Sequence, residues 1–170
     1  VLTVTVNYTD SLDTAESVTS AATGSVANVN DAPSGSVTIS GTATEDQTLT
    51  AVTGTIVDED GLGSFSYQWN RAGSAISGAT SASYTLTQAD VGSAITVTAS
   101  YTDAQSTGES LTSVATGSVA NVNDAPSGSV TISGTAMEDG VLTAANTLMD
   151  EDVLGTISYS WSNGDTGATT

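Results

Sequence analysis

A stretch of sixteen residues, NVNDAPSGSVTISGTA, occurs twice in this chain without a substitution, at 28–43 and at 121–136. The two copies are 93 positions apart, counted from Asn28 to Asn121, and other motifs recur near the same offset, with one residue lost after Gly54. A period of this length is too long for a solenoid unit and predicts a whole domain repeated in tandem. The other recurring motifs are Tyr8-Thr9-Asp10 with Tyr101-Thr102-Asp103, Glu45-Asp46 with Glu138-Asp139, and Trp69 with Trp161.

One complete period is predicted at 31–123. It is flanked by the end of a preceding copy at 1–30 and by the beginning of a following copy at 124–170. Together the end copies lack a counterpart of 79–93, so neither closes a domain by itself. One hypothesis is that half-repeats of different molecules complement one another head to tail.

A permuted frame is the alternative, in which 1–78 and 94–170 are two copies of one unit and 79–93 connects them. The two frames predict different neighbours for Trp69, which are Val97 and Ile95 in the first frame and Val4 and Val6 in the second. We favour the first frame, because strands usually pair with near neighbours and the Asn-Asp-Pro linker indicates a boundary.

Apolar and polar residues alternate along several short segments, as they do in half-buried strands. Phe65, Tyr67 and Trp69, for example, alternate with Ser and Gln. About seven such segments within some 90 residues predict an all-β fold, an antiparallel β-sandwich. Helix is limited to one turn at Thr87–Val91. The expected strands are 2–8, 37–40, 48–57, 64–69, 83–87, 95–101, 110–119 and, in the following copy, 157–161.

The charge of the chain is strongly one-sided. Nineteen Asp and Glu stand against one basic residue, Arg71, which gives a formal net charge of −18 without any Lys or His. Nucleic acids and anionic membrane surfaces draw their affinity from Lys and Arg, so both are excluded as partners. Crowded carboxylates repel one another, and they therefore call for multivalent cations, of which Ca2+ is the obvious candidate.

Enzymatic functions find little support in the composition. The absence of His, Cys and Lys removes the usual general bases and several nucleophiles. A glycosidase-type carboxylate pair is formally available, but the acidic residues fall in predicted inter-domain loops without a walled cleft. We therefore expect a non-catalytic protein. No apolar run approaches the roughly 20 residues of a membrane-spanning helix, so membrane insertion is not expected either.

Calcium takes about six to eight oxygen ligands, so carboxylates must converge from separate loops. In a sandwich, the incoming linker lies at one end, together with the loop after the second strand and the loop after the sixth. The outgoing linker lies at the other end, together with the turn between the first two strands. The candidate ligands at the first junction are Asn28, Asn30, Asp31, Asp58, Glu59, Asp60 and Asp103. Those at the second junction are Glu45, Asp46, Asn121, Asn123, Asp124, Asp150, Glu151 and Asp152.

Asn and Asp in β-proteins often only form turns, by bonding their own backbone. The recurrence of Glu-Asp and Asp-Glu-Asp in register favours ligands instead. Asp58-Glu59-Asp60-Gly61 becomes Asp150-Glu151-Asp152-Val153, and neither copy continues as an EF-hand loop, so the expected geometry does not depend on the glycine.

Several motifs resemble known families. Trp69 in SYQWNRAG, followed by YTLTQADVGSAITV, resembles an immunoglobulin-like sandwich, although Ile95 and Val97 stand where that family has its corner Tyr and second Cys. The linker NVNDAP is similar to the calcium-binding junction of cadherin-like domains. Together with ISGTATED, DEDGLG and YTLTQADVG, it resembles the extender repeats of large bacterial RTX-type adhesins. This resemblance implies an extracellular, calcium-rigidified spacer on a bacterial cell surface, whose partners are adjacent repeats of the same polypeptide.

Two other binding functions fit parts of the sequence. Trp69, Trp161 and the tyrosines could form a sugar-stacking platform, as in a carbohydrate-binding module, but their alternation with Ser and Gln favours rings that face a core. Thr3-Val4-Thr5 and Thr96-Val97-Thr98 could belong to an ice-binding face, yet alternation alone places Thr outward on a sheet.

Overall fold

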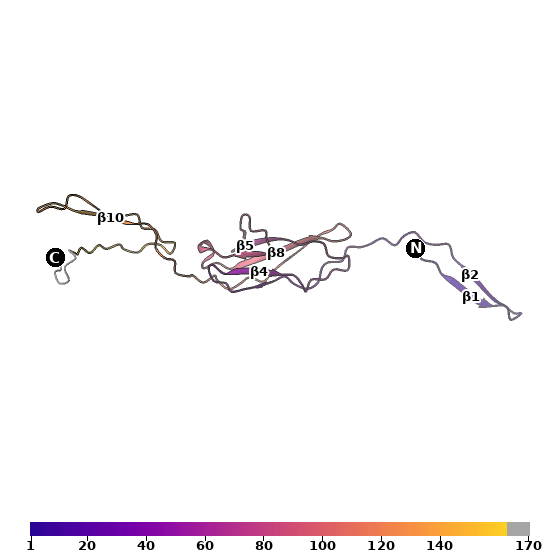
Figure 1. Ribbon diagram of the computed structural model, residues 1–170. Helices are drawn as coiled ribbons and strands as arrows, with labels where there is room; N and C mark the ends of the chain where they lie inside the picture. Colours follow the sequence, from indigo (N-terminus) through magenta and orange to yellow (C-terminus); the bar gives the residue numbers. More distant parts are fainter. Residues whose placement is uncertain (163–170) are drawn as a thin grey trace.

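The computed structural model describes residues 1–162 of the chain, and almost all of its regular structure is antiparallel β-sheet. Figure 1 shows three parts in a row: a hairpin at the N-terminal side, a central body, and a second hairpin with an extended segment at the C-terminal side. None of the helical structure in this range is long and apolar enough to cross a membrane.

The central body contains two sheets. One has the order β3-β4-β7 and the other β6-β5-β8-β9, and all neighbouring strands are antiparallel. A single 3-10 turn, η1, spans Gln88–Asp90, inside the one turn that the sequence predicts. The strands are β3 (Thr38–Ser40), β4 (Thr48–Val52), β5 (Ser66–Arg71), β6 (Ser74–Ala75), β7 (Ser83–Thr85), β8 (Ile95–Thr102) and β9 (Gly108–Thr112).

Both sheets contribute to one hydrophobic core. Leu49 of β4, Trp69 of β5 and Val97 of β8 are completely buried. Along β8 every second residue from Ile95 to Tyr101 is buried, which is the period of a strand with one face inward. The buried Trp69 indole N–H donates a hydrogen bond to the carbonyl of Ser81 at 2.9 Å, so its one polar atom is satisfied.

The pairing of Trp69 distinguishes the two frames. Trp69 pairs with Val97, and Arg71 pairs with Ile95, in the β5–β8 register. Val4 and Val6 lie exposed in the N-terminal hairpin instead. The neighbours of Trp69 are therefore those expected of the first frame.

The two hairpins repeat pairings of the central body. In β1 (Thr5–Thr9) with β2 (Ala15–Thr19), the register Thr5–Thr19 matches Thr98–Thr112 of β8 and β9. In β10 (Val130–Ser133) with β11 (Thr143–Asn146), the register Thr131–Ala145 matches Thr38–Val52 of β3 and β4. The repeated sequence therefore forms the same local ladder with or without a sheet to cover it.

Several strand expectations differ from the structure. β1 begins at Thr5 rather than at residue 2. β9 ends at Thr112 rather than reaching 119, because the hydroxyls of Ser113 and Thr116 accept the N–H groups of Val97 and Ile95 and interrupt the ladder. β4 ends at Val52, since a turn follows in which the Ile56 N–H donates to the Thr53 carbonyl. Residues 157–161 form no strand, and no counterpart of β8 lies beside them. The short β6 was not predicted.

Candidate metal centre at the junctions

The chain leaves the central body along the turn between β3 and β4. The Glu45 N–H donates to the carbonyl of Ala120 at 2.9 Å, and the Val122 N–H donates to Glu45 Oε2 at 3.2 Å. Glu45 is a buried residue. Its carboxylate is thus directed from the central body toward the outgoing linker.

The same linker is hydrogen-bonded to the loop that follows β11. Asp152 Oδ2 accepts the Asp124 N–H at 2.8 Å, and Asp152 Oδ1 accepts the Asn121 side-chain N–H at 2.6 Å. These donors, the Asp124 N–H first, lower the pKa of Asp152 below its ordinary value. We call the hydrogen bond from the linker Asp N–H to the loop Asp carboxylate the clasp.

Three carboxylates meet at this second junction. One oxygen each of Glu45, Asp124 and Glu151 lies within 4.8 Å of the other two. They come from the central body, from the linker and from the loop after β11. Oxygen atoms at this spacing can surround one hard cation such as Ca2+, and without a cation the like charges repel one another.

The first junction repeats the clasp. The Asp31 N–H donates to Asp60 Oδ2 at 2.8 Å, at positions that correspond to Asp124 and Asp152. The Asp60 N–H donates to Asp58 Oδ1 at 2.8 Å, as the Asp152 N–H does to Asp150 Oδ1 at 2.9 Å. Among the described residues, the β1–β2 hairpin and the linker precede Asp31, and the clasp forms here without contacts from a preceding sandwich.

Additional acidic groups line the first junction. The Tyr101 hydroxyl donates to Asp58 Oδ2, and the pKa of Tyr101 is raised by its burial and by this carboxylate. The Asn30 side chain donates to Glu109 Oε1 at 3.0 Å. The linker is thus tied to β9 as well as to the loop after β4.

Asp103 directly follows β8 and is buried, and only one of its two carboxylate oxygens accepts hydrogen bonds from the described residues. Its Oδ1 accepts the N–H groups of Gln105 at 2.8 Å and Thr107 at 2.7 Å. Its Oδ2 is buried and accepts no hydrogen bond within the described residues, and the neighbouring Ala104 N–H donates to the Asp60 carbonyl at 3.1 Å. A buried carboxylate oxygen without a donor is costly, so this atom fits a cation ligand.

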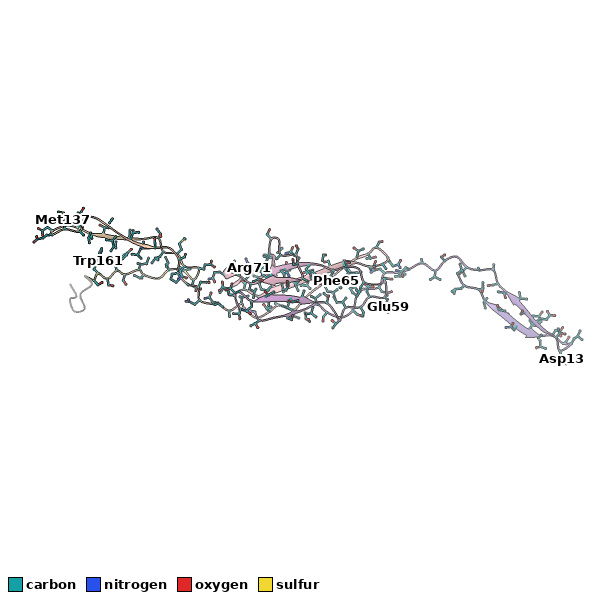
Figure 2. The ribbon with its side chains drawn as sticks, viewed as in Figure 1. Asp13, Glu59, Phe65, Arg71, Met137 and Trp161 are labelled. Atoms are coloured by element: carbon teal, nitrogen blue, oxygen red, sulfur yellow. The ribbon has the colours of Figure 1, made fainter. Side chains whose placement is uncertain are left out.

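The remaining candidate ligands belong neither to the triad nor to a clasp. The Asn123 side chain donates to the Asp124 carbonyl, and the Asp46 N–H donates to the Leu86 carbonyl while its side chain is exposed. Asn28 and Glu59 are also exposed. Figure 2 shows Glu59 at the end of the central body toward the N-terminal hairpin and Arg71 toward the opposite end.

The sequence predicts only a turn at Thr87–Val91, whereas the structure gathers a cluster of polar groups around Asp90. The completely buried Asp90 accepts hydrogen bonds from Arg71 Nε at 2.7 Å, from the Tyr84 hydroxyl at 2.9 Å and from the Thr87 N–H at 2.8 Å. Burial by itself would raise the pKa of Asp90, but these donors outweigh it and lower the pKa. A signal was present, since one Arg among nineteen acids is expected to find a carboxylate.

Neither protein-family models nor curated proteins nor solved structures gave a match to this chain.

Proposed function

We propose that this chain is a non-catalytic structural spacer, built of tandem immunoglobulin-like β-sandwich repeats, in which Ca2+ at the inter-domain linkers makes the array rigid. The observation that carries the proposal is the triad of Glu45, Asp124 and Glu151, whose oxygens lie within 4.8 Å of one another. These residues come from three successive parts of the chain, so one cation at this place would tie them together.

The clasp suggests that different residues of a junction order the linker and restrict the hinge between neighbouring bodies. Asp31 and Asp124 bond to the loop that follows them, at 2.8 Å in both copies. Each linker is therefore ordered by the body after it. Glu45 is the carboxylate that reaches from the body before the linker, and a cation bound to it would remove the remaining hinge freedom.

The electrostatics support the same role. A net charge of −18 has one internal counter-charge, Arg71, and that group is bonded to Asp90 away from the triad. Without a cation the carboxylates of the junction repel one another, and the joint is expected to flex. Pro33 and Pro126 stiffen the linkers further, since proline fixes its own φ and keeps the preceding residue extended.

The proposal includes a domain assignment and a location. Residues 31–123 form the complete repeat, 1–30 end a preceding one and 124–170 begin a following one. Because the motifs resemble RTX-type extender repeats, we place the spacer on a bacterial cell surface, where adjacent repeats project distal ligand-binding domains away from the cell.

A carbohydrate-binding module remains less favoured. Such a module needs exposed rings beside a polar cleft. Trp69 and Tyr101 are buried, and Phe65 and Tyr84 pack against the core. The half-exposed rings are Tyr8 on the N-terminal hairpin and Tyr159 and Trp161 on the C-terminal segment, on opposite sides of the central body, so the three do not share one platform.

The test is small-angle scattering and calcium titration calorimetry of the full chain. Calcium is expected to lengthen and narrow the distance distribution relative to chelator. Glu45→Gln keeps the size of the side chain but removes the charge, and it should abolish this change at the second junction. Asp13→Asn removes one exposed charge at the tip of the β1–β2 hairpin and is the matched control. The same maximum dimension in calcium and in chelator would contradict the proposal.

A further inference from the structure

The place where the chain leaves the central body differs from the rest of its sheets. All neighbouring strands of the two sheets are antiparallel, whereas residues 119–120, which we call the exit segment, make parallel bridges. One bridge joins Ala120 to Thr44, and the other joins Val119 to Val91. The exit segment therefore lies between two parts of the body that are far apart in the sequence.

The first bridge connects the exit segment to the segment that enters the body. The Ala120 N–H donates to the Ala43 carbonyl, and the Glu45 N–H donates to the Ala120 carbonyl, both at 2.9 Å. Residues 43–45 follow β3, which is the first strand after the first linker. The part of the chain that enters the body and the part that leaves it are therefore hydrogen-bonded directly to each other.

The second bridge connects the exit segment to the turn after η1. The Val119 N–H donates to the Ser93 carbonyl, and the Gly92 N–H donates to the Val119 carbonyl, both at 2.9 Å. The Ser93 N–H in turn donates to the carbonyl of Asp90, whose carboxylate is paired with Arg71 at 2.7 Å. The Asp90 cluster thus supports one side of the exit segment.

The direction of the chain decides how tension acts on these bonds. The two linkers leave the central body at opposite ends (Figure 1). Tension between the linkers pulls residues 43–45 back toward the first linker and pulls the exit segment forward toward the second. Because the two segments are parallel and their hydrogen bonds run across the ladder, the pull follows their common axis and strains all of these bonds together. A hairpin that is pulled by its two open ends loses its bonds one after another instead.

We propose that the exit segment and its two parallel bridges form a mechanical clamp, which lets the central body carry tension between its two linkers without unfolding. Resistance to forced unfolding is governed by the unfolding rate rather than by the equilibrium stability. A few hydrogen bonds that must break together across the line of force therefore protect the body more than the same bonds elsewhere. The clamp consists of backbone groups and needs no cation.

Calcium at the second junction would reinforce the clamp, and this step alone rests on the proposed function. Glu45 donates its N–H to the exit segment, and its Oε2 accepts the Val122 N–H at 3.2 Å. The carboxylate of Glu45 also belongs to the triad with Asp124 and Glu151. A cation in the triad would hold the linker against Glu45, so tension could not peel the chain away from 43–45 beginning at the linker.

The test pulls single molecules of the full chain in two geometries. The chain contains no Cys, so one introduced Cys gives a unique attachment point. Pulling from the two ends of the chain strains the clamp along its axis. Pulling between the C-terminal end and Gln47→Cys, at an exposed position just after 43–45, opens the same hydrogen bonds from one side. At equal force the central body should unfold at least about tenfold faster in the second geometry, because the bonds then break one at a time.

Two proline variants, both pulled from the ends of the chain, supply a matched comparison. Ala120→Pro removes one donor of the clamp at an exposed position and should speed forced unfolding about fivefold. Thr80→Pro removes the N–H that donates to the Gly78 carbonyl in the loop between β6 and β7, off the line of force, and should change the rate by less than about twofold. The comparison of geometries needs no proline, so it tests the clamp even if Ala120→Pro does not fold.

Equal unfolding rates in the two geometries at the same force would overturn the clamp. The unfolding event of the central body is recognised by a released length of roughly 300 Å, at about 3.5 Å for each residue. The calcium step is tested separately by pulling from the two ends in calcium and in chelator. Calcium should slow unfolding, and Glu45→Gln should abolish this gain. A rate that depends on geometry but not on calcium would support the clamp and contradict the cation-bridged junction.

Discussion

Asp90 and Asp103 are two buried carboxylates of the same body, and the protein satisfies them differently. Asp90 lies beside Arg71 and accepts hydrogen bonds on both oxygens. Asp103, near the loop of Asp58–Asp60, accepts two N–H groups on Oδ1 and none on Oδ2. One charge is neutralised by Arg71, whereas one oxygen of the other carboxylate accepts no hydrogen bond from the described residues.

The same contrast distinguishes the carboxylates of the second junction. Asp152 has both oxygens occupied by N–H donors and resembles Asp90 in that respect. Glu45, Asp124 and Glu151 face one another instead. In the proposed spacer, Asp60 and Asp152 would therefore order the linkers, and the triad would hold the cation.

The largest expected effect comes from breaking the internally satisfied site. Asp90→Ala leaves Arg71 and Tyr84 without their acceptor, and the free energy of unfolding should fall by about 3 kcal/mol. Calcium should not restore it, because this carboxylate has no role at a junction. Urea denaturation in calcium and in chelator measures both effects, and Asp13→Ala is the control. A loss of unfolding free energy that calcium reverses would contradict the contrast between Asp90 and Asp103.

The loss of stability at low pH should also depend on Asp90. Because the pKa of Asp90 is lowered in the folded protein, its contribution to stability is present above the ordinary carboxyl pKa of about 3.9 and is lost as the pH falls through the lowered value. The unaltered chain should therefore lose stability more steeply below about pH 4 than Asp90→Ala does. Equal slopes in thermal melts across this range would contradict the role of Asp90.

Much of the central body could be predicted from local pattern. Alternation along Phe65–Trp69 and Ile95–Tyr101 located two strands that are paired neighbours, and the repeat offset located both linkers. The Arg71–Asp90 pair could not be located, because it depends on which loops share one end of the body. Residues 157–161 have the alternating pattern of a strand but do not form one. A strand needs a neighbouring strand to pair with, and the pattern describes only the residues of the strand itself.

The next prediction concerns the loop that contains the acidic residues Asp58–Asp60. Gly61 has a φ of 89°, and the corresponding Val153 has a φ of 73°, a conformation that β-branched residues rarely adopt. Gly61→Val should destabilise the central body by about 2 kcal/mol, since its Cβ would also approach that of Ala104 to 3.3 Å. Val153→Gly should leave the main thermal transition unchanged. Equal effects of the two substitutions on the main thermal transition would contradict this prediction.

A further prediction concerns the role of Asp103. Asp103→Asn keeps the acceptor for Gln105 and Thr107 but removes the charge from the buried atom. In chelator the free energy of unfolding should change by less than about 0.5 kcal/mol, whereas the stabilisation by calcium should fall by about 1 kcal/mol or more. Asp10→Asn is the matched control, because Asp10 accepts the Leu12 and Thr14 N–H groups in the same way on the exposed hairpin. A large decrease in the free energy of unfolding in chelator would mean that Asp103, like Asp90, stabilises the fold without a cation.

The smallest effect is expected at Asp152, where the clasp lies at the surface of the second junction. The Asp124 N–H and the Asn121 amide lower the pKa of Asp152, so the hydrogen bond to Asp124 should persist below pH 3.9 and be lost as the pH falls through the lowered value. The amide chemical shift of Asp124, followed by NMR in chelator, measures this midpoint. Asn121→Ala should move the midpoint upward, but not as far as the ordinary carboxyl value, because the backbone donor remains. A midpoint at or above 3.9 in the unaltered chain would mean that the clasp does not stabilise the charged carboxylate, and the linker would then depend on the cation for its order.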